Sequence, residues 1–164
     1  MISEIIQKVF IQNGWTLATA ESCTGGNIAH QITLNPGSSE YFVGSVVSYS
    51  NNVKKNVLGV NSEDLKQFGA VSEQVAIQMA SGVRKLMQTD FAISSTGIAG
   101  PTGGTSQKPV GTVWIGIASY TGTFAKKFQF YGDRESVINQ TTKKAFEMLL
   151  NEVPRQDSIS LKNK

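Results

Sequence analysis

Four segments of the chain place apolar residues three or four positions apart, the spacing that lines one face of an amphipathic helix. We expect helices over residues 3–13, 24–33, 73–88 and 134–151. Ser3 and Ser72 are positioned to cap the first and third of these, and Asn13-Gly14 is a stop signal for the first. A shorter helical segment is predicted around Lys54.

Runs rich in Val, Ile and aromatic residues predict strands between these helices. The expected strands cover residues 15–21, 42–49, 91–95, 110–120 and 123–131, and the last two flank the hairpin signal Thr121-Gly122. Because strands and helices alternate before this hairpin, we expect an α/β fold, a three-layer αβα sandwich with a mixed, largely parallel sheet. A single domain over residues 1–153 is predicted, with residues 154–164 as a polar tail that we expect to be disordered.

The composition is that of a globular protein, since 40% of the 164 residues are hydrophobic and 16% are charged. The formal net charge is only +3, and no Lys- and Arg-rich run with interleaved aromatic residues predicts a nucleic-acid partner. No signal-peptide pattern is present, and no apolar stretch reaches the roughly 18 residues of a membrane span. We therefore expect a cytoplasmic protein that contacts neither nucleic acid nor membrane.

Metal and disulfide sites have little support from the residue types in the sequence. Cys23 is the only cysteine and His30 the only histidine, so an internal disulfide, a cysteine cage and a multi-histidine site are excluded. The carboxylates Glu21, Asp90 and Asp133 show no recognisable ligand spacing. We expect no metal site.

Residues 19–26 end a predicted strand with small and hydroxyl side chains and lead into a predicted helix. Ser22 in this position is either an ordinary helix cap or a nucleophile held clear of the backbone. His30 is too distant to activate it, because eight helical residues span about 12 Å. Lys54 is the remaining candidate base, and Tyr49 precedes it at the end of the second strand, on the sheet edge where α/β proteins bind ligands. From spacing alone, a solvated Lys54 and a half-buried Tyr49 are the favoured interpretations.

A glycine-dense segment, residues 96–104, follows the third predicted strand. Its glycines let backbone amides approach an anion, and Thr96 and Thr102 add hydroxyl donors. It matches neither the dinucleotide-binding pattern nor the P-loop. An anion-binding loop and a purely structural loop are equally compatible with this segment. Cys23, beside Ser22, is interpreted as a small buried residue.

Six motifs occur in order along the chain and are together far more specific than any one of them. They are Ala20-Glu21-Ser22-Cys23-Thr24-Gly25-Gly26, Tyr49-Ser50-Asn51-Asn52-Val53-Lys54, Leu58-Gly59-Val60, Gly69-Ala70-Val71-Ser72-Glu73, Thr96-Gly97-Ile98-Ala99-Gly100-Pro101 and Lys108-Pro109-Val110-Gly111-Thr112-Val113. With them the chain resembles the C-terminal domain of the CinA family, the nicotinamide-nucleotide amidases, over roughly residues 15–150. It looks like the standalone form of that family.

The resemblance implies hydrolysis of the carboxamide of nicotinamide mononucleotide to nicotinic acid mononucleotide and ammonia, without a metal or organic cofactor. It implies Ser22 as the nucleophile and Tyr49 and Lys54 as its activating partners. It also implies a homo-oligomer, and Arg134 near the substrate phosphate or at a subunit contact. The substrate-binding positions that it suggests are Glu21, Thr24, Gly25, Gly26, Thr96, Gly97, Ile98, Ala99, Gly100 and Arg134.

Amides near Thr24 and Gly25 are expected to stabilise the tetrahedral intermediate, while the Thr24 hydroxyl closes the helix. One position departs from the family pattern, since Ile138 stands where a basic residue often follows Gly132-Asp133-Arg134. The alternative function is a nucleotide-binding or regulatory module of the same fold with little or no catalysis. A DNA-associated factor has the least support, because it requires several phosphate contacts and a steep salt dependence.

Overall fold

The structure, a computed structural model, describes residues 1–154, so the predicted tail beyond Pro154 lies outside the described residues. Its helices are α1 (Ile2–Asn13), α2 (Asn27–Thr33), η1 (Ser38–Glu40, a 3-10 turn), α3 (Asn51–Leu58), α4 (Ser62–Phe68), α5 (Glu73–Met87) and α6 (Arg134–Glu152). Its strands are β1 (Leu17–Glu21), β2 (Phe42–Val47), β3 (Phe91–Gly97), β4 (Thr112–Ser119) and β5 (Gly122–Gln129).

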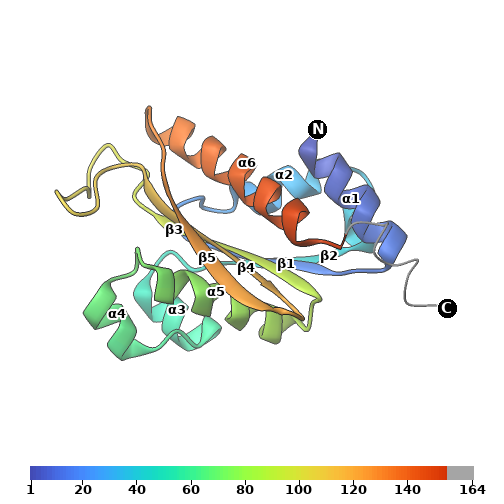
Figure 1. The fold of residues 1–164 in the computed structure, drawn as a ribbon, viewed down its shortest axis with the longest axis horizontal. Coiled ribbons are helices and arrows are strands. Elements are labelled where there is room, and N and C mark those ends of the chain that lie inside the picture. Colours follow the sequence, from blue (N-terminus) through green and yellow to red (C-terminus); the bar gives the residue numbers. More distant parts are fainter. Residues whose placement is uncertain (155–164) are drawn as a thin grey trace.

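The strands form one mixed sheet in the order β2-β1-β3-β4-β5. β1 pairs with β2 and β3 in parallel, and β4 pairs antiparallel with β3 and with β5. Helices α1, α2 and α6 cover one face of the sheet, and α3, α4 and α5 cover the other (Figure 1). The predicted three-layer sandwich with a mixed sheet is confirmed.

Each face of the sheet has its own apolar core. The core under α1, α2 and α6 is built from large side chains that include Phe10, Ile28 and Phe146. The core under α5 is built from alanines of the central strands against Val75, Met79 and other α5 residues. α3 packs closely on α5 because Gly82 has no side chain; a Cβ there would lie 2.0 Å from the Leu58 carbonyl oxygen.

Of the two predicted serine caps, one is confirmed and the other is wrong. The Ser72 hydroxyl accepts a hydrogen bond from the Val75 amide and caps α5, as predicted. Ser3 is not a cap, because α1 begins at Ile2 and buries Ser3 inside its first turn. Gly14 ends α1 in the left-handed conformation (φ 65°), as the stop signal indicated.

The parallel strands bring three chain segments to one edge of the sheet. Glu21, at the end of β1, is in register with Val47 of β2 and with Ser95 of β3. The loop that follows β3 projects from the body of the molecule at the left of Figure 1. Ser22, the segment after Val47 and the glycine-dense loop are therefore neighbours in space.

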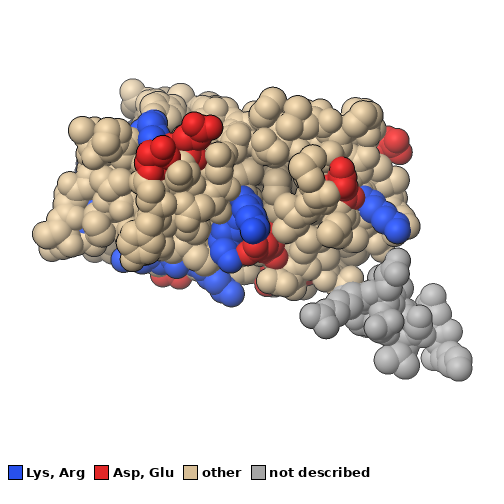
Figure 2. Space-filling view, turned by 90° about the horizontal axis from the view of Figure 1, so that it is seen from above, with Lys and Arg blue, Asp and Glu red and all other residues tan. Residues whose placement is uncertain are grey.

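The layer formed by α1, α2 and α6 presents a mostly uncharged surface. Figure 2 shows positive and negative side chains on this face in small separate groups, without a continuous stripe of one sign. Among the described residues, no helix is both long enough and apolar enough to cross a membrane.

Candidate functional site

Ser22 and Lys54 meet at the edge of the sheet where β1 and β2 end. The Lys54 Nζ lies 3.0 Å from the Ser22 Oγ and donates to the Ser48 carbonyl oxygen at 2.7 Å. Ser50 caps α3 through the Val53 amide and thereby fixes the helix that carries Lys54. The structure thus joins the predicted nucleophile and the predicted base through a direct contact.

The surroundings of Lys54 disfavour its charged form. The residue is only 2% exposed, and no carboxylate in the described part of the chain forms an ion pair with it. Burial lowers the pKa of the Lys54 ammonium. A Cys23 thiolate would oppose this shift, but burial raises the pKa of the Cys23 thiol to about 12, so the thiol is neutral near pH 7. Lys54 is therefore a buried lysine without a counter-ion, beside a serine hydroxyl.

Glu21 was expected to contact substrate, and the structure places it elsewhere. Its side chain is fully buried, and its carboxylate accepts from the amides of Gly26, Ile28 and Ala29 at 2.9–3.1 Å. The carboxylate thus takes up the free amides at the start of α2, where negative charge is favoured. Glu21 holds the turn around Ser22 and has no surface left for a ligand.

The helix cap expected of the Thr24 hydroxyl and the oxyanion contact expected of the Gly25 amide are also corrected. The Thr24 hydroxyl does not cap α2, which begins three residues later and has Gly26 as its N-cap without a side-chain hydrogen bond. It is buried, donates to Glu21 Oε2 at 2.7 Å and lies 2.7 Å from the Ser95 hydroxyl. The Gly25 amide donates to the Ser22 carbonyl oxygen and is not free for an oxyanion.

A pocket of about 230 Å³ lies between the β3–β4 loop and the start of α6. Cys23, the chain neighbour of Ser22, lines it, but Ser22 and Lys54 do not. It is lined by Cys23, Tyr49, Gly97, Ile98, Ala99, Gly100, Thr102, Gly103 and Arg134. Six of the predicted site residues therefore converge on it: Tyr49, Gly97, Ile98, Ala99, Gly100 and Arg134. Gly26 and Thr96 do not line it, and the buried Thr96 hydroxyl donates instead to the Ala70 carbonyl oxygen at 2.8 Å.

Tyr49 and Arg134 close one side of this pocket as a pair. Tyr49 is 63% exposed, and its hydroxyl accepts from the Arg134 guanidinium at 2.9 Å. A second guanidinium nitrogen donates to the Gly100 carbonyl oxygen at 2.7 Å. Tyr49 was expected to activate Ser22 together with Lys54, but its hydroxyl is turned to Arg134 and forms no hydrogen bond with Ser22 or Lys54 in this structure.

Sequence reasoning missed Cys23 and Gly103 as lining residues and Ser48 as the carbonyl partner of Lys54. Cys23 is buried as expected, yet it faces the pocket. Only its position next to Ser22 could have indicated this. Ser48 could have been inferred from the end of β2, since a carbonyl one residue beyond a strand has lost its ladder partner.

Ile138, the position where a basic residue is often found in the family, packs partly buried against the core beneath α6. It does not line the pocket between the β3–β4 loop and the start of α6. The departure from the family pattern therefore falls on an apolar contact of α6 in this chain.

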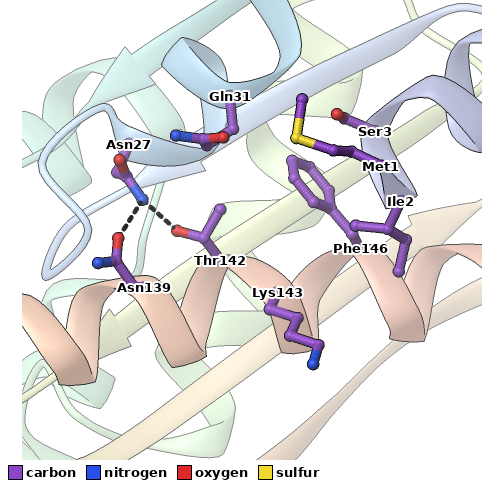
Figure 3. Close-up of a pocket in the computed structure, with 9 residues that line it drawn as sticks. All are labelled: Met1, Ile2, Ser3, Asn27, Gln31, Asn139, Thr142, Lys143 and Phe146. Atoms are coloured by element: carbon purple, nitrogen blue, oxygen red, sulfur yellow. Dashed lines mark hydrogen bonds between the residues drawn. The ribbon is translucent and has the colours of Figure 1, made fainter.

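A larger pocket of about 530 Å³ lies between α1, α2 and α6, away from Ser22 and Lys54. Figure 3 shows amide side chains at one end, where Asn27 contacts Asn139 and Thr142, and the apolar groups of Met1, Ile2 and Phe146 at the other. It holds none of the predicted site residues and no paired acid and base. The smaller pocket is therefore the candidate functional site, because six of the predicted site residues line it together with Cys23, the chain neighbour of Ser22. Residues 1–154 contain no group of three metal-binding side chains.

Comparisons with known proteins identify the family. The sequence model of the CinA C-terminal domain matches residues 1–153. The chain is 51% identical over 145 residues to a competence-damage inducible protein of Clostridium tetani (strain Massachusetts / E88). It is 47% identical over 148 residues to a CinA-like protein of Geotalea uraniireducens (strain Rf4). These matches cover 88% and 90% of the chain but only 36% and 35% of the relatives, so the chain spans about a third of their length.

A solved structure has the same fold over nearly the whole chain. The competence/damage inducible protein CihA from Agrobacterium tumefaciens matches with a TM-score of 0.89 and 40% identity, over 92% of each chain. The family model, the relatives and this structure all identify the same family. The chain belongs to the CinA C-terminal domain family.

Proposed function

We propose that this chain hydrolyses a primary carboxamide with Ser22 as nucleophile and Lys54 as base, and that its substrate is nicotinamide mononucleotide. The observation that carries the proposal is the 3.0 Å contact between Lys54 Nζ and Ser22 Oγ, made by a buried lysine without a carboxylate partner. A serine hydroxyl is a weak nucleophile until a neighbouring base takes its proton. A lysine performs this role when desolvation favours its neutral amine.

The Ser48 carbonyl supports this assignment by orienting the amine. A neutral Lys54 has two N–H bonds and one lone pair, and it donates one N–H to Ser48 at 2.7 Å. The lone pair is then available to the Ser22 hydroxyl, which becomes the donor across the 3.0 Å contact. Ser22 is partly exposed, so an incoming carbonyl carbon can reach it.

The proposed reaction proceeds in two balanced steps. Ser22 Oγ bonds to the carboxamide carbon while its proton passes to Lys54 Nζ, and the C–N bond then breaks as Lys54 returns the proton to departing ammonia. Water then passes a proton to Lys54 and attacks the resulting ester. The bond between the acyl carbon and Ser22 Oγ breaks as Lys54 returns that proton to Oγ, which releases the carboxylic acid and restores Ser22. The net change adds water to the amide and releases ammonia, without a metal or an organic cofactor.

The size of the pocket favours a nucleotide substrate that inserts only one end into it. Its volume of about 230 Å³ is below the about 300–1,000 Å³ typical of sites that enclose a whole ligand. A pyridinecarboxamide ring fits such a volume, with the ribose phosphate outside it. Arg134 is exposed at the rim and offers a cation to the phosphate, and Tyr49 offers an aromatic face to the ring.

The test is an ammonia-release assay with nicotinamide mononucleotide on the wild type and on Ser22→Ala and Lys54→Ala. We expect both variants to lose at least about a hundredfold in kcat, because each removes one half of the activated nucleophile. Lys55→Ala is the matched control, since Lys55 is the adjacent exposed lysine and should keep wild-type activity. Wild-type turnover equal to that of buffer would reject this substrate, and a fully active Ser22→Ala would reject the nucleophile. Binding of the nucleotide without turnover would favour the alternative, a nucleotide-binding or regulatory module.

A further inference from the structure

The backbone amides around the proposed nucleophile divide into those that have an acceptor and those that do not. From Ser22 to His30, each N–H donates to an oxygen of the described chain except those of Cys23 and Thr24. Ser22 donates to the Ser95 carbonyl at 2.9 Å, and Gly25 donates to that of Ser22 at 3.0 Å. The two amides without an acceptor are the two that directly follow the nucleophile.

The hydrogen bonds of these amides also exclude the start of α2 as an anion site. Glu21 already accepts from Gly26, Ile28 and Ala29, and its own negative charge faces that helix end. A developing oxyanion placed there would meet a carboxylate instead of free donors. The amides of Cys23 and Thr24 lie before the helix and donate to neither oxygen of this carboxylate, although the Thr24 hydroxyl does.

Both residues are buried, which makes their free amides unusual. Cys23 is 7% exposed and Thr24 is 3% exposed. More than about nine in ten buried backbone N–H groups in proteins have an acceptor. The Cys23 amide contacts its own sulfur, which is only a weak acceptor. Two adjacent buried donors without partners indicate a ligand atom that completes them.

We propose that the backbone amides of Cys23 and Thr24 form the oxyanion hole of the reaction proposed above, on which this inference rests. Attack by Ser22 Oγ forms a C–O bond and moves the carbonyl electron pair onto the carboxamide oxygen. The peptide bond between Ser22 and Cys23 places the Cys23 amide close to the attacked carbon, and Cys23 lines the pocket. The oxyanion accepts from both amides until the C–N bond breaks.

The side chains of the same two residues hold this geometry in place. Thr24 Oγ is fixed by Glu21 and by Ser95, so the Thr24 peptide group cannot turn freely. The Cys23 thiol is neutral, because its pKa is raised to about 12 by burial, and it adds no negative charge beside the oxyanion. Donors that are already fixed in place need no reorganisation when the oxyanion forms. In other enzymes, removal of one such donor lowers kcat by about 100- to 1,000-fold.

The experiment uses pyridine-3-boronic acid, whose boron accepts a serine oxygen and becomes a tetrahedral anion resembling the intermediate. Amide ¹H–¹⁵N spectra of the wild-type chain are recorded with and without the probe, and the ¹¹B signal reports whether the adduct forms. We expect the amide protons of Cys23 and Thr24 to move downfield and to exchange more slowly in the adduct. The Gly26 amide, held by Glu21, is the internal control and should not move. Ser22→Ala should show neither the adduct nor the shifts.

The outcomes separate this inference from the function on which it rests. An adduct that leaves the Cys23 and Thr24 amides unchanged, or shifts those of Ala99 and Gly100 across the pocket in their place, rejects the oxyanion hole and keeps Ser22 as nucleophile. No adduct at millimolar probe in the wild type rejects a reactive Ser22, and the oxyanion hole with it. Thr24→Ser, which keeps both the N–H and the hydroxyl that contacts Glu21 and Ser95, should retain the downfield shifts, and their loss in this variant would reject the role of the Thr24 amide.

Discussion

At the scale of single residues, the charge state of Lys54 decides what the site can do. A protonated amine can only donate to Ser22, whereas a neutral amine can accept its proton. Burial without a carboxylate partner shifts this balance toward the neutral form. The neutral Cys23 thiol beside it leaves the balance undisturbed near pH 7.

We predict that kcat/KM rises with pH through a pKa below the ordinary value of a lysine. The pKa of Lys54 is lowered by desolvation, so the fraction of free base grows as pH increases through that lowered value. The checks are the pH–rate profile and the ¹³Cε signal of Lys54, which should titrate with the same pKa. The control is Lys55→Ala, which removes the adjacent exposed lysine and should leave the pH–rate profile unchanged. A profile that stays flat while Lys54 titrates would show that Lys54 is not the base.

At the scale of elements, α2 depends on a carboxylate from the strand before it. A helix of seven residues is marginal by itself, and this one has no side-chain cap of its own. Glu21 supplies the missing acceptors from the end of β1 and joins β1, the turn around Ser22 and α2 into one unit. The nucleophile thereby lies on a rigid turn.

We predict that Glu21→Ala lowers the free energy of unfolding by about 2–3 kcal/mol, because it leaves buried amides and the Thr24 hydroxyl without their acceptor. Urea unfolding measures this change. The control is Glu63→Ala, which removes an exposed carboxylate from the first turn of α4 and its surface ion pair with Lys66, and should change stability by less than about 0.5 kcal/mol. If the two substitutions cost the same, the capping role of Glu21 is refuted.

At the scale of the whole molecule, one sheet carries two cores. The larger core contains an aromatic group in which Phe10 packs against Trp15 at 6.0 Å, Tyr41 at 5.7 Å and Phe91 at 5.3 Å between ring centroids. The smaller core lies on the opposite face and shares the strands β1 and β3. Because both cores need the same sheet, the two helical layers should unfold together.

We predict that Phe10→Ala destabilises the fold by about 3–5 kcal/mol in a single cooperative transition. In a Trp114→Phe background, where Trp15 is the remaining tryptophan, fluorescence reports the larger core and far-UV circular dichroism reports all helices. Both signals should change at the same urea concentration. The matched control is Ile5→Ala, at a 55% exposed position of the same helix, which should cost far less. Helical signal that persists after the Trp15 change would contradict the coupling of the two layers.

The sequence by itself determined the layers, the order of strands and helices and the family, because periodic apolar positions and ordered motifs are local in the chain. It also predicted that Ser22 and Lys54 act together, through the motifs that carry them. Only the tertiary structure decided which neighbouring side chains face the pocket. Glu21 turned out to hold α2, and Thr24 is bound to Glu21 and Ser95.

The physical reason is that a turn between a strand and a helix can present successive residues to opposite sides. Whether a polar group meets substrate or the protein interior then depends on acceptors brought from distant segments. Tyr49, for example, lies 85 positions before its partner Arg134 in the sequence, and Ser95 lies 71 positions after Thr24. No local pattern in the sequence contains these pairs. Such long-range contacts decide which residues line the site and which ones support it.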